Sequence, residues 1–239
     1  MLLCAVVLIT MAACGRSADG EGENETSKTP TATTAPDGSY SVTLPDKTVL
    51  ELSGTPKRIV SMGPNITDIL FELGVGERVV GRTDYCDTPK GVENIPSVGT
   101  LFSPNVEMIL SLEPDLVIGS LLFSEETQKQ LEDMGIKVAV LYDSKSVDGI
   151  YDMIRAIGAL TGQNKEGDAL AERTQKQIED AVAKYSGAEY KDFVAPTVYY
   201  VSGYAESRDY NAPGDSYIGQ LIQPPGGNNN AKEVEGWVI

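Results

Sequence analysis

IVSMGPNITDILFELG, residues 59–74, decides the fold of this chain. A short apolar run leads through Gly63-Pro64 into apolar residues at helical spacing, namely Ile66, Ile69, Leu70 and Leu73. Asn65 is placed as an N-cap, with Asp68 three residues later as in a capping box, and Gly74 follows the last apolar position. The stretch therefore predicts a buried strand, a tight turn and an amphipathic helix.

Strand-like and helical patterns keep alternating after this stretch. They fall at residues 79–81, 106–112, 116–118, 124–135, 138–142 and 146–157. Nearly continuous apolar strands that alternate with helices are typical of a parallel sheet covered on both faces. We therefore predict a Rossmann-like α/β lobe over residues 38–163, which begins with a small hairpin at residues 40–52.

The carboxyl edge of this predicted sheet is the expected ligand-binding side, because open α/β sheets bind ligands beyond the carboxyl ends of their strands. The segments that follow the predicted strands are residues 63–65, residues 83–85, Ser120 and residues 142–144. We expect a ligand of this lobe to lie against them.

A long and heavily charged segment follows the first lobe. Its thin apolar stripe consists of Leu170, Ile178, Ala181, Val182 and Tyr185. A helix of ~22 residues is ~33 Å long, and a helix that is polar around most of its surface suits a connection between two bodies. We predict that residues 164–186 form one long helix that links two lobes.

Residues 187–239 predict part of a second Rossmann-like α/β lobe. They hold a strand near residues 198–201, in which Tyr199 and Tyr200 are expected to be core residues, and a short helix near residues 218–222. This region is much shorter than the first lobe and stops on three apolar residues. We therefore expect the second lobe to be incomplete, truncated at its C-terminal end, and the open reading frame to be longer.

Cys14 closes a short apolar run and precedes a polar, acidic, threonine-rich stretch. The run is too short to span a bilayer, which takes about 20 apolar residues, and small residues before the cysteine suit a cleaved signal. We predict a lipoprotein signal peptide at residues 1–14, lipidation of Cys14 and a disordered tether at residues 15–37. The chain would then be anchored on the extracytoplasmic face of the cell membrane. An ordinary secretory signal and a frayed helix are the alternatives. No Lys or Arg precedes the apolar run, although the n-region of a signal normally carries one, so this feature counts against the lipoprotein signal.

The composition disfavours several functions. The chain has 19 Lys and Arg against 35 Asp and Glu, a formal net charge of −16, so it repels the phosphate backbone of nucleic acids. It has no histidine, which removes the usual general base of a hydrolase triad and the commonest zinc and haem ligand. We predict no nucleic-acid partner, no catalytic residues, no resident metal and no cofactor.

Two further sequence features have ordinary explanations. Cys86 is the one cysteine left after the predicted signal and anchor, and we interpret it as a packing residue, with a reactive thiol as the alternative. Gly74-Val75-Gly76 follows a predicted helix rather than a strand, so it is a helix stop and not a dinucleotide-binding loop. The chain has no Gly-x-x-x-x-Gly-Lys phosphate loop, so an ATPase would be a separate chain.

The chain resembles the substrate-binding proteins of ABC importers for cobalamin and ferric siderophores over about residues 50–239. The resemblance rests on the order and spacing of motifs at residues 56–61, 63–70, 80–87, 96–99, 104–107, 113–117, 226–228 and 236–238. It implies two α/β lobes joined by one long helix, which is the architecture that the residue pattern also predicts. It implies that a bulky organic ligand binds between the lobes and that the protein then docks on a membrane permease. Gln223-Pro224-Pro225 departs from the family pattern.

The resemblance also implies roles for individual residues. The side chains expected to contact the ligand are Asn65, Tyr85, Phe102, Tyr204 and Trp237. Flat aromatic side chains with polar tips suit a large, partly apolar ligand, although each aromatic has a rim or core position as its alternative. Glu107 matches the family's acidic residue for permease docking. Its alternative role is to stabilise a helix N-terminus through the helix dipole.

These observations predict a monomeric solute-binding protein that captures cobalamin or a ferric siderophore and delivers it to an ABC permease with a separate ATPase. The block at residues 81–87 favours cobalamin, while haem and bare metal ions remain open as cargo. An exported α/β enzyme that acts in the same cleft is the alternative, although no Gly-x-Ser-x-Gly elbow supports it. A surface protein with only a scaffolding role is a third reading.

Overall fold

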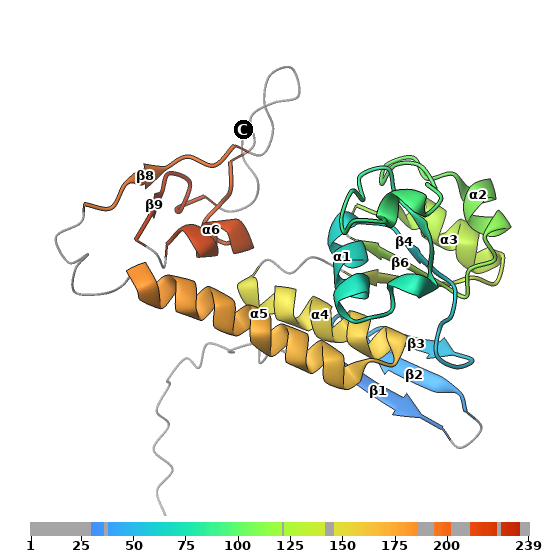
Figure 1. Cartoon of the computed structure of the whole chain (residues 1–239). Helices are drawn as coiled ribbons and strands as arrows, with labels where there is room; N and C mark the ends of the chain where they lie inside the picture. The colour runs from blue at the N-terminus through green and yellow to red at the C-terminus, as the bar shows by residue number, and fades with distance from the viewer. Residues whose placement is uncertain are drawn as a thin grey trace, which may run out of the picture.

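The computed structural model describes residues 30–35, 38–120, 122–141, 146–185, 194–201, 211–223 and 226–234. It has a large N-terminal lobe, a pair of helices that extends from this lobe, and a smaller C-terminal segment at the far end of the pair (Figure 1). The predicted signal peptide with Cys14, and the predicted ligand contacts Tyr204 and Trp237, lie outside the described residues.

Four parallel strands form the centre of the N-terminal lobe. They are β4 (Ile59–Ser61), β5 (Val79–Arg82), β6 (Leu116–Ser120) and β7 (Lys137–Leu141). The strands pair in the order β5-β4-β6-β7, and every pair is parallel. The parallel sheet predicted from the apolar runs is confirmed.

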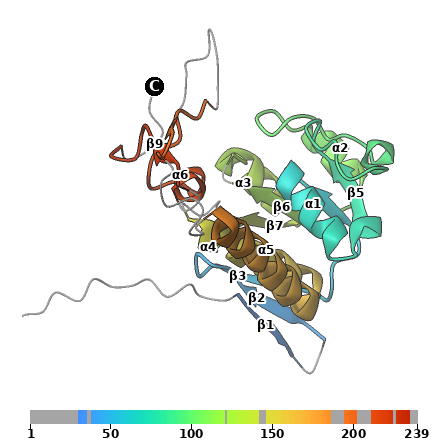
Figure 2. The same cartoon turned by 60° about the vertical axis from the view of Figure 1, so that its left-hand side comes forward.

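Helices cover both faces of this sheet (Figures 1 and 2). They are α1 (Pro64–Glu72), α2 (Val106–Ser111), α3 (Glu125–Asp133) and α4 (Val147–Thr161), with short 3-10 turns η1 (Gly76–Arg78) and η2 (Val92–Asn94). Successive residues of a strand point to opposite faces, so Ile59 joins the core formed with α1 and α4, while Val60 joins the core formed with α2 and α3. The lobe therefore has one apolar layer on each side of the sheet.

Capping residues explain where three of these helices begin. A side-chain oxygen accepts a hydrogen bond from the backbone amide three residues further on at Asn105, Ser124 and Ser146. The predicted N-cap at Asn65 is wrong, because α1 already begins at Pro64 and has Gly63 as its N-cap without a side-chain bond. Proline has the backbone angle of a first helical residue and lacks the N–H that a cap would satisfy, so it starts the helix one position earlier.

A second, antiparallel sheet packs against the same lobe. It consists of β1 (Thr31–Thr34), β2 (Tyr40–Thr43) and β3 (Val49–Leu52), in that order. The predicted hairpin is confirmed. The predicted tether is wrong for residues 31–34, which pair with β2. A strand ladder is made of backbone hydrogen bonds, and threonine suits a strand, so a segment with little apolar content can still add to a sheet edge.

Tyr40 joins the antiparallel sheet to α4. Its side chain is buried, and its hydroxyl donates a hydrogen bond to the carbonyl oxygen of Ala159. Burial raises the pKa of Tyr40 above its ordinary value, because the phenolate would lose its hydration, and a hydrogen bond with Asn164 opposes this shift. Because β1 pairs with β2, which Tyr40 joins to α4, the lobe starts at β1, earlier than the predicted boundary at residue 38.

α5 (Asn164–Tyr185) begins at the predicted residue and is described up to one residue before the predicted end at 186, and it lies side by side with α4 (Figures 1 and 2). The two helices touch at paired glycines: a Cβ atom on Gly158 would lie 2.9 Å from the Cα atom of Gly167. Leu170 and Ala171 are buried in the core of the lobe. The prediction of a helix that only bridges two bodies was therefore incomplete, because one side of α5 packs on α4.

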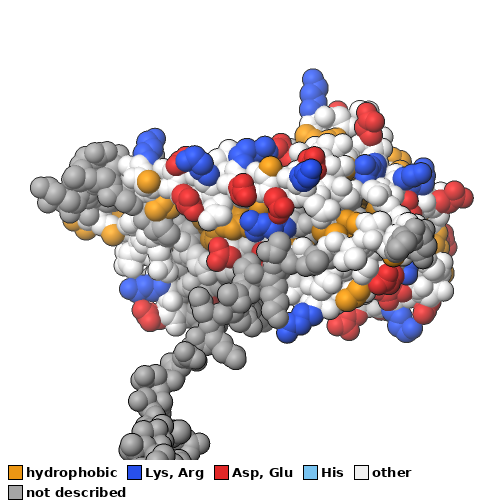
Figure 3. All heavy atoms as spheres, turned by 90° about the horizontal axis from the view of Figure 1, so that it is seen from below, with side chains coloured by type: hydrophobic (Ala, Val, Ile, Leu, Met, Phe, Trp, Pro, Cys, Tyr) orange, Lys and Arg blue, Asp and Glu red, His pale blue; other side chains and the backbone are white. Residues whose placement is uncertain are grey.

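The outer side of α5 is polar, as its sequence predicts. Arg173 Nη2 lies 2.7 Å from Glu72 Oε2 of α1, and Lys176 Nζ lies 3.0 Å from Asp180 Oδ1 along the helix. Basic and acidic side chains alternate on the face of the molecule seen from below (Figure 3). Such a mixed charged surface is typical of a solvated face.

The C-terminal segment is a small α/β unit. It consists of β8 (Thr197–Val198), α6 (Tyr217–Ile222) and β9 (Asn228–Asn229), with β8 and β9 parallel. The short helix is confirmed. The predicted core position of Tyr199 is wrong, because β8 ends at Val198 and Tyr199 is 55% exposed. Among the described residues, a sheet of two short strands has little apolar surface against which to bury a tyrosine.

Replacing Gly158 with alanine should destabilise the protein. Alanine favours a helix by roughly 1 kcal/mol over glycine, but the new methyl group would meet the backbone of Gly167 and of Gln163 at 2.9 Å. Overpacking of this kind typically costs about 1–3 kcal/mol, so we expect a net loss in the free energy of unfolding, measured by urea denaturation.

Gln177→Ala is the control for this substitution, because Gln177 is exposed on α5. It should change the free energy of unfolding by less than about 0.5 kcal/mol. A Gly158→Ala protein as stable as the unmodified protein would show that the two helices do not depend on this contact.

Candidate functional site

The carboxyl edge of the parallel sheet exposes side chains that can contact a ligand. Asn65 follows β4 in the first turn of α1 and is exposed, Tyr85 follows β5 and is 49% exposed, and Leu122 follows β6 and is 52% exposed. Two of the predicted ligand residues, Asn65 and Tyr85, therefore lie at one edge. Leu122 was missed by the sequence analysis, although its place just after a buried strand is a usable signal.

A buried cluster of hydroxyl and thiol groups holds this edge together. Thr67 Oγ1 of α1 lies 2.8 Å from Ser61 Oγ and 3.2 Å from Cys86 Sγ. Thr83 Oγ1 also lies 3.2 Å from Cys86 Sγ, and all four residues are buried. The cluster joins the turn that carries Asn65 to the loop that carries Tyr85. Cys86 is buried, as expected for a packing residue, and its hydrogen bonds were not predicted.

Further hydrogen bonds fix the loop on both sides of Tyr85. Thr88 Oγ1 donates to Asp68 Oδ1 of α1 at 2.7 Å, and Ser97 Oγ donates to Asp84 Oδ1. A loop that is held at both ends loses little conformational freedom when a ligand binds. Tyr85 is therefore presented by a rigid loop.

Phe102 lies on a neighbouring loop rather than at a strand end. Gly99 and Pro104 form an isolated bridge at the base of this loop, and the backbone amide of Asp84 donates to the carbonyl oxygen of Gly99 at 2.9 Å. Phe102 is 71% exposed. The core alternative is therefore excluded for Tyr85 and Phe102, which are both on the surface.

Glu107 is exposed in the first turn of α2. No ion pair links its carboxylate to another residue of the described part of the chain. Its position suits both the docking role and the helix-dipole role.

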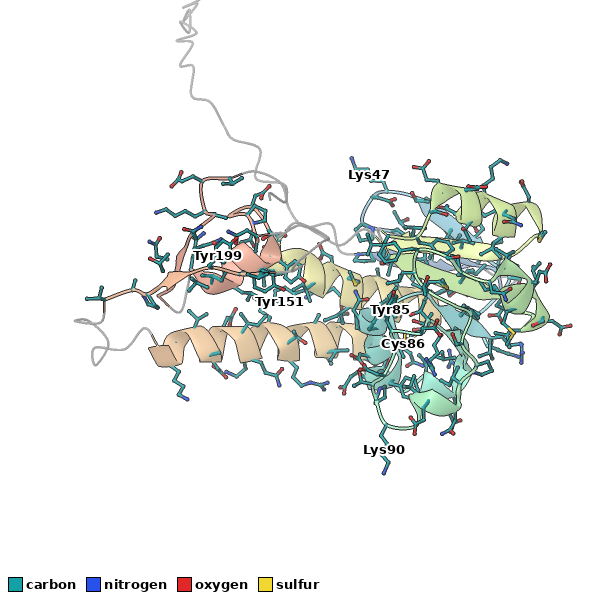
Figure 4. The ribbon with its side chains drawn as sticks, turned by 90° about the horizontal axis from the view of Figure 1, so that it is seen from above. Lys47, Tyr85, Cys86, Lys90, Tyr151 and Tyr199 are labelled. Carbon is teal, nitrogen blue, oxygen red and sulfur yellow. The ribbon has the colours of Figure 1, made fainter. Side chains whose placement is uncertain are left out.

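The carboxyl edge is turned toward the C-terminal segment. Figure 4 shows Tyr85 on the side of the N-terminal lobe nearer to that segment and Tyr199 on the segment itself. Val194 and Val201 flank β8 and are also exposed. The exposed Tyr199 is a second candidate contact that the sequence analysis missed, because it was assigned to the core.

A surface hollow of about 640 Å³ lies elsewhere, at the amino end of the sheet. Its lining includes Ser53, Lys57, Asp115 and Lys137, and it contains no aromatic side chain. A large flat ligand needs apolar and aromatic surface, so this hollow fits such a ligand less well than the carboxyl edge does.

Two negative findings hold for the described residues. They contain no group of three or more Cys, Asp or Glu side chains arranged to hold a metal ion. None of their helices combines the length and the apolar character that crossing a membrane requires.

Solved structures of binding proteins share this fold. A periplasmic heme-binding protein of Roseiflexus is 28% identical, with a TM-score of 0.67 over 77% of this chain and 70% of that protein. A possible iron-binding periplasmic protein of Staphylococcus epidermidis is 26% identical, with a TM-score of 0.68 over the same shares of the two chains.

Relatives found by sequence similarity are also binding proteins. An uncharacterized ABC transporter substrate-binding lipoprotein of Bacillus subtilis is 31% identical over 100% of this chain and 73% of its own length. A cobalamin-binding protein of Halobacterium salinarum is 32% identical over 82% of this chain, which spans 52% of that relative. The periplasmic binding protein family matches residues 59–235. The chain therefore belongs to the periplasmic binding protein family.

Proposed function

We propose that this chain is the receptor of an ABC importer, which captures a bulky organic ligand and delivers it to a permease that works with a separate ATPase. One observation carries the proposal: a rigid carboxyl edge with Tyr85, Asn65 and Leu122 on its surface faces a second α/β segment. Membership of the family supports binding rather than catalysis, and none of the relatives named above is described as an enzyme.

Cobalamin is the ligand that we favour. The edge is acidic, because Asp84 and Asp87 flank Tyr85 on either side and both are exposed. Haem carries propionate carboxylates and many ferric siderophores are anionic, so an acidic edge repels them, whereas the amide-rich rim of a corrin is neutral. The cobalamin-binding relative from Halobacterium supports the same choice.

We propose the cellular location of the protein from the predicted lipidation of Cys14. The Bacillus relative is a lipoprotein, which supports lipidation of Cys14 and anchoring on the extracytoplasmic face of the membrane. A diacylated cysteine would hold the receptor close to its permease, since two acyl chains give stable membrane binding and one does not. We propose that the receptor acts there as a monomer.

Tyr85→Ala should weaken binding of cyanocobalamin by roughly tenfold, because a half-exposed aromatic at the centre of a contact surface often contributes more than 1 kcal/mol. Isothermal titration calorimetry of the purified protein measures this change. Haemin and an anionic ferric catecholate siderophore should bind more weakly than cyanocobalamin.

Met134→Ala is the control, since Met134 is a large exposed apolar residue beyond the end of α3, near the amino end of β7. It should leave the affinity unchanged. If none of the three ligands binds the unmodified protein, the proposed ligand class is wrong. Turnover of an ester or glycoside substrate would instead support the enzyme alternative.

Glu107→Arg should weaken association with the permease without changing affinity for the ligand. The substitution reverses the charge at the proposed docking position, and like charges facing each other slow and weaken association. The measurement is the stimulation of ATP hydrolysis by the reconstituted transporter. The Glu107→Arg protein should need at least a fivefold higher concentration than the unmodified receptor to give the same stimulation.

Glu126→Arg is a matched control, because Glu126 is exposed at the second residue of α3 just as Glu107 is at the second residue of α2. Both substitutions lose the same interaction with a helix dipole. If the two substitutions have equal effects on ATP hydrolysis, Glu107 has no special role in docking on the permease and only stabilises the N-terminus of α2.

A further inference from the structure

The N-terminus of α4 is a meeting point of the two parts of the chain. The first backbone N–H groups of a helix have no partner within the helix. At α4 the amide of Val147 donates to Gln220 Oε1 at 2.9 Å, and Gln220 belongs to α6 of the C-terminal segment. Ser146 Oγ accepts from Gly149 N at 3.3 Å. Each part of the chain thus supplies an acceptor to the same helix end.

α6 is also the element through which the C-terminal segment rests on the rest of the protein. It lies next to the first residues of α4 in both ribbon views (Figures 1 and 2). The segment is tightly joined to α6: the amide of Gly227 donates to the carbonyl oxygen of Ile222 at 3.1 Å, and a Cβ atom added to Gly219 would overlap the carbonyl oxygen of Pro213. A displacement of α6 would therefore move the segment as a unit.

The hydrogen bond between the Val147 amide and Gln220 Oε1 can set the position of the C-terminal segment relative to α4. It is partly buried, and it links residues that are 73 positions apart in sequence. The partial positive charge of a helix N-terminus favours an acceptor and disfavours a donor at this position. Apolar contacts are non-directional, whereas one hydrogen bond to a helix end fixes both distance and angle.

We propose that Gln220 is a positioning residue, whose side-chain oxygen sets the placement of the C-terminal segment relative to the ligand-binding edge. The effect on ligand affinity rests on the proposed function, whereas the effect on the arrangement of the two parts does not. The side chain acts through the end of α4 and does not itself contact the ligand.

Two substitutions separate the acceptor from the bulk of the side chain. Gln220→Met keeps the length of glutamine but removes the acceptor, and Gln220→Glu keeps an acceptor that the helix dipole favours. Gln223→Met is the control, because Gln223 is the C-cap of the same helix and is exposed.

The first readout is the distance between spin labels on Lys90→Cys in the N-terminal lobe and Glu233→Cys in the C-terminal segment, in a chain whose Cys4 and Cys14 are replaced by serine. Both labelled positions are exposed. Gln220→Met should broaden or shift the distance distribution, while Gln220→Glu and Gln223→Met should preserve it. If Gln220→Met unfolds the segment, the Gln220→Glu protein still tests the proposal. A carboxylate is an acceptor without an N–H donor, so an unchanged distance in Gln220→Glu supports the acceptor role.

The second readout is the affinity for cyanocobalamin. Gln220→Met should weaken it about threefold to tenfold, as expected for the loss of one hydrogen bond, and Gln220→Glu should restore it. An unchanged distance in Gln220→Met, or equal broadening in Gln220→Met and Gln220→Glu, would overturn the proposal. If the unmodified protein does not bind cyanocobalamin, the choice of ligand fails, and the distance measurement still tests the role of Gln220.

Discussion

The backbone contact between Gly158 and Gly167 sets the course of the chain through the molecule. Only Gly162 and Gln163 separate α4 from α5, and the glycine contact lets the two helices lie close together, so α5 runs back along α4 toward the end at which α4 began. That end lies on the side of the carboxyl edge, so the C-terminal segment is brought to face Tyr85. Larger side chains at this crossing would push the two helices apart. The position of the C-terminal segment opposite Tyr85 therefore depends on small residues at the crossing.

Features with local causes could be predicted from the sequence. The starts of α2, α3 and α4 follow from capping residues, and the strands of the parallel sheet follow from apolar runs. The errors have non-local or competing causes. β1 forms because a neighbouring strand offers its edge, and Tyr199 stays exposed because few residues pack around β8. At the start of α1 two local signals compete: Asn65 favours an N-cap, whereas Pro64 favours the first helical position. The helix begins at Pro64, because the fixed backbone angle of proline suits that position.

The candidate site was predictable in position but not in construction. The rule for parallel sheets places a ligand at the carboxyl edge, and Asn65 and Tyr85 were found there by position in sequence. The cluster of Ser61, Thr67 and Cys86 beneath them joins three separate segments, and no spacing in the sequence signals it. Gln220 was missed for the same reason, because its partner lies 73 positions away.

The two sides of the proposed binding surface differ in how firmly they are held. The N-terminal edge rests on a close-packed core and a buried hydrogen-bond cluster, so its side chains are ordered before a ligand arrives. In the described C-terminal segment the buried apolar residues are Ala212, Pro213 and Ala231, which bury little apolar area. Its placement must then depend more on directional bonds such as that of Gln220 to α4. A preorganised edge lowers the entropic cost of binding, while the placement of the opposite side depends on a small number of directional bonds.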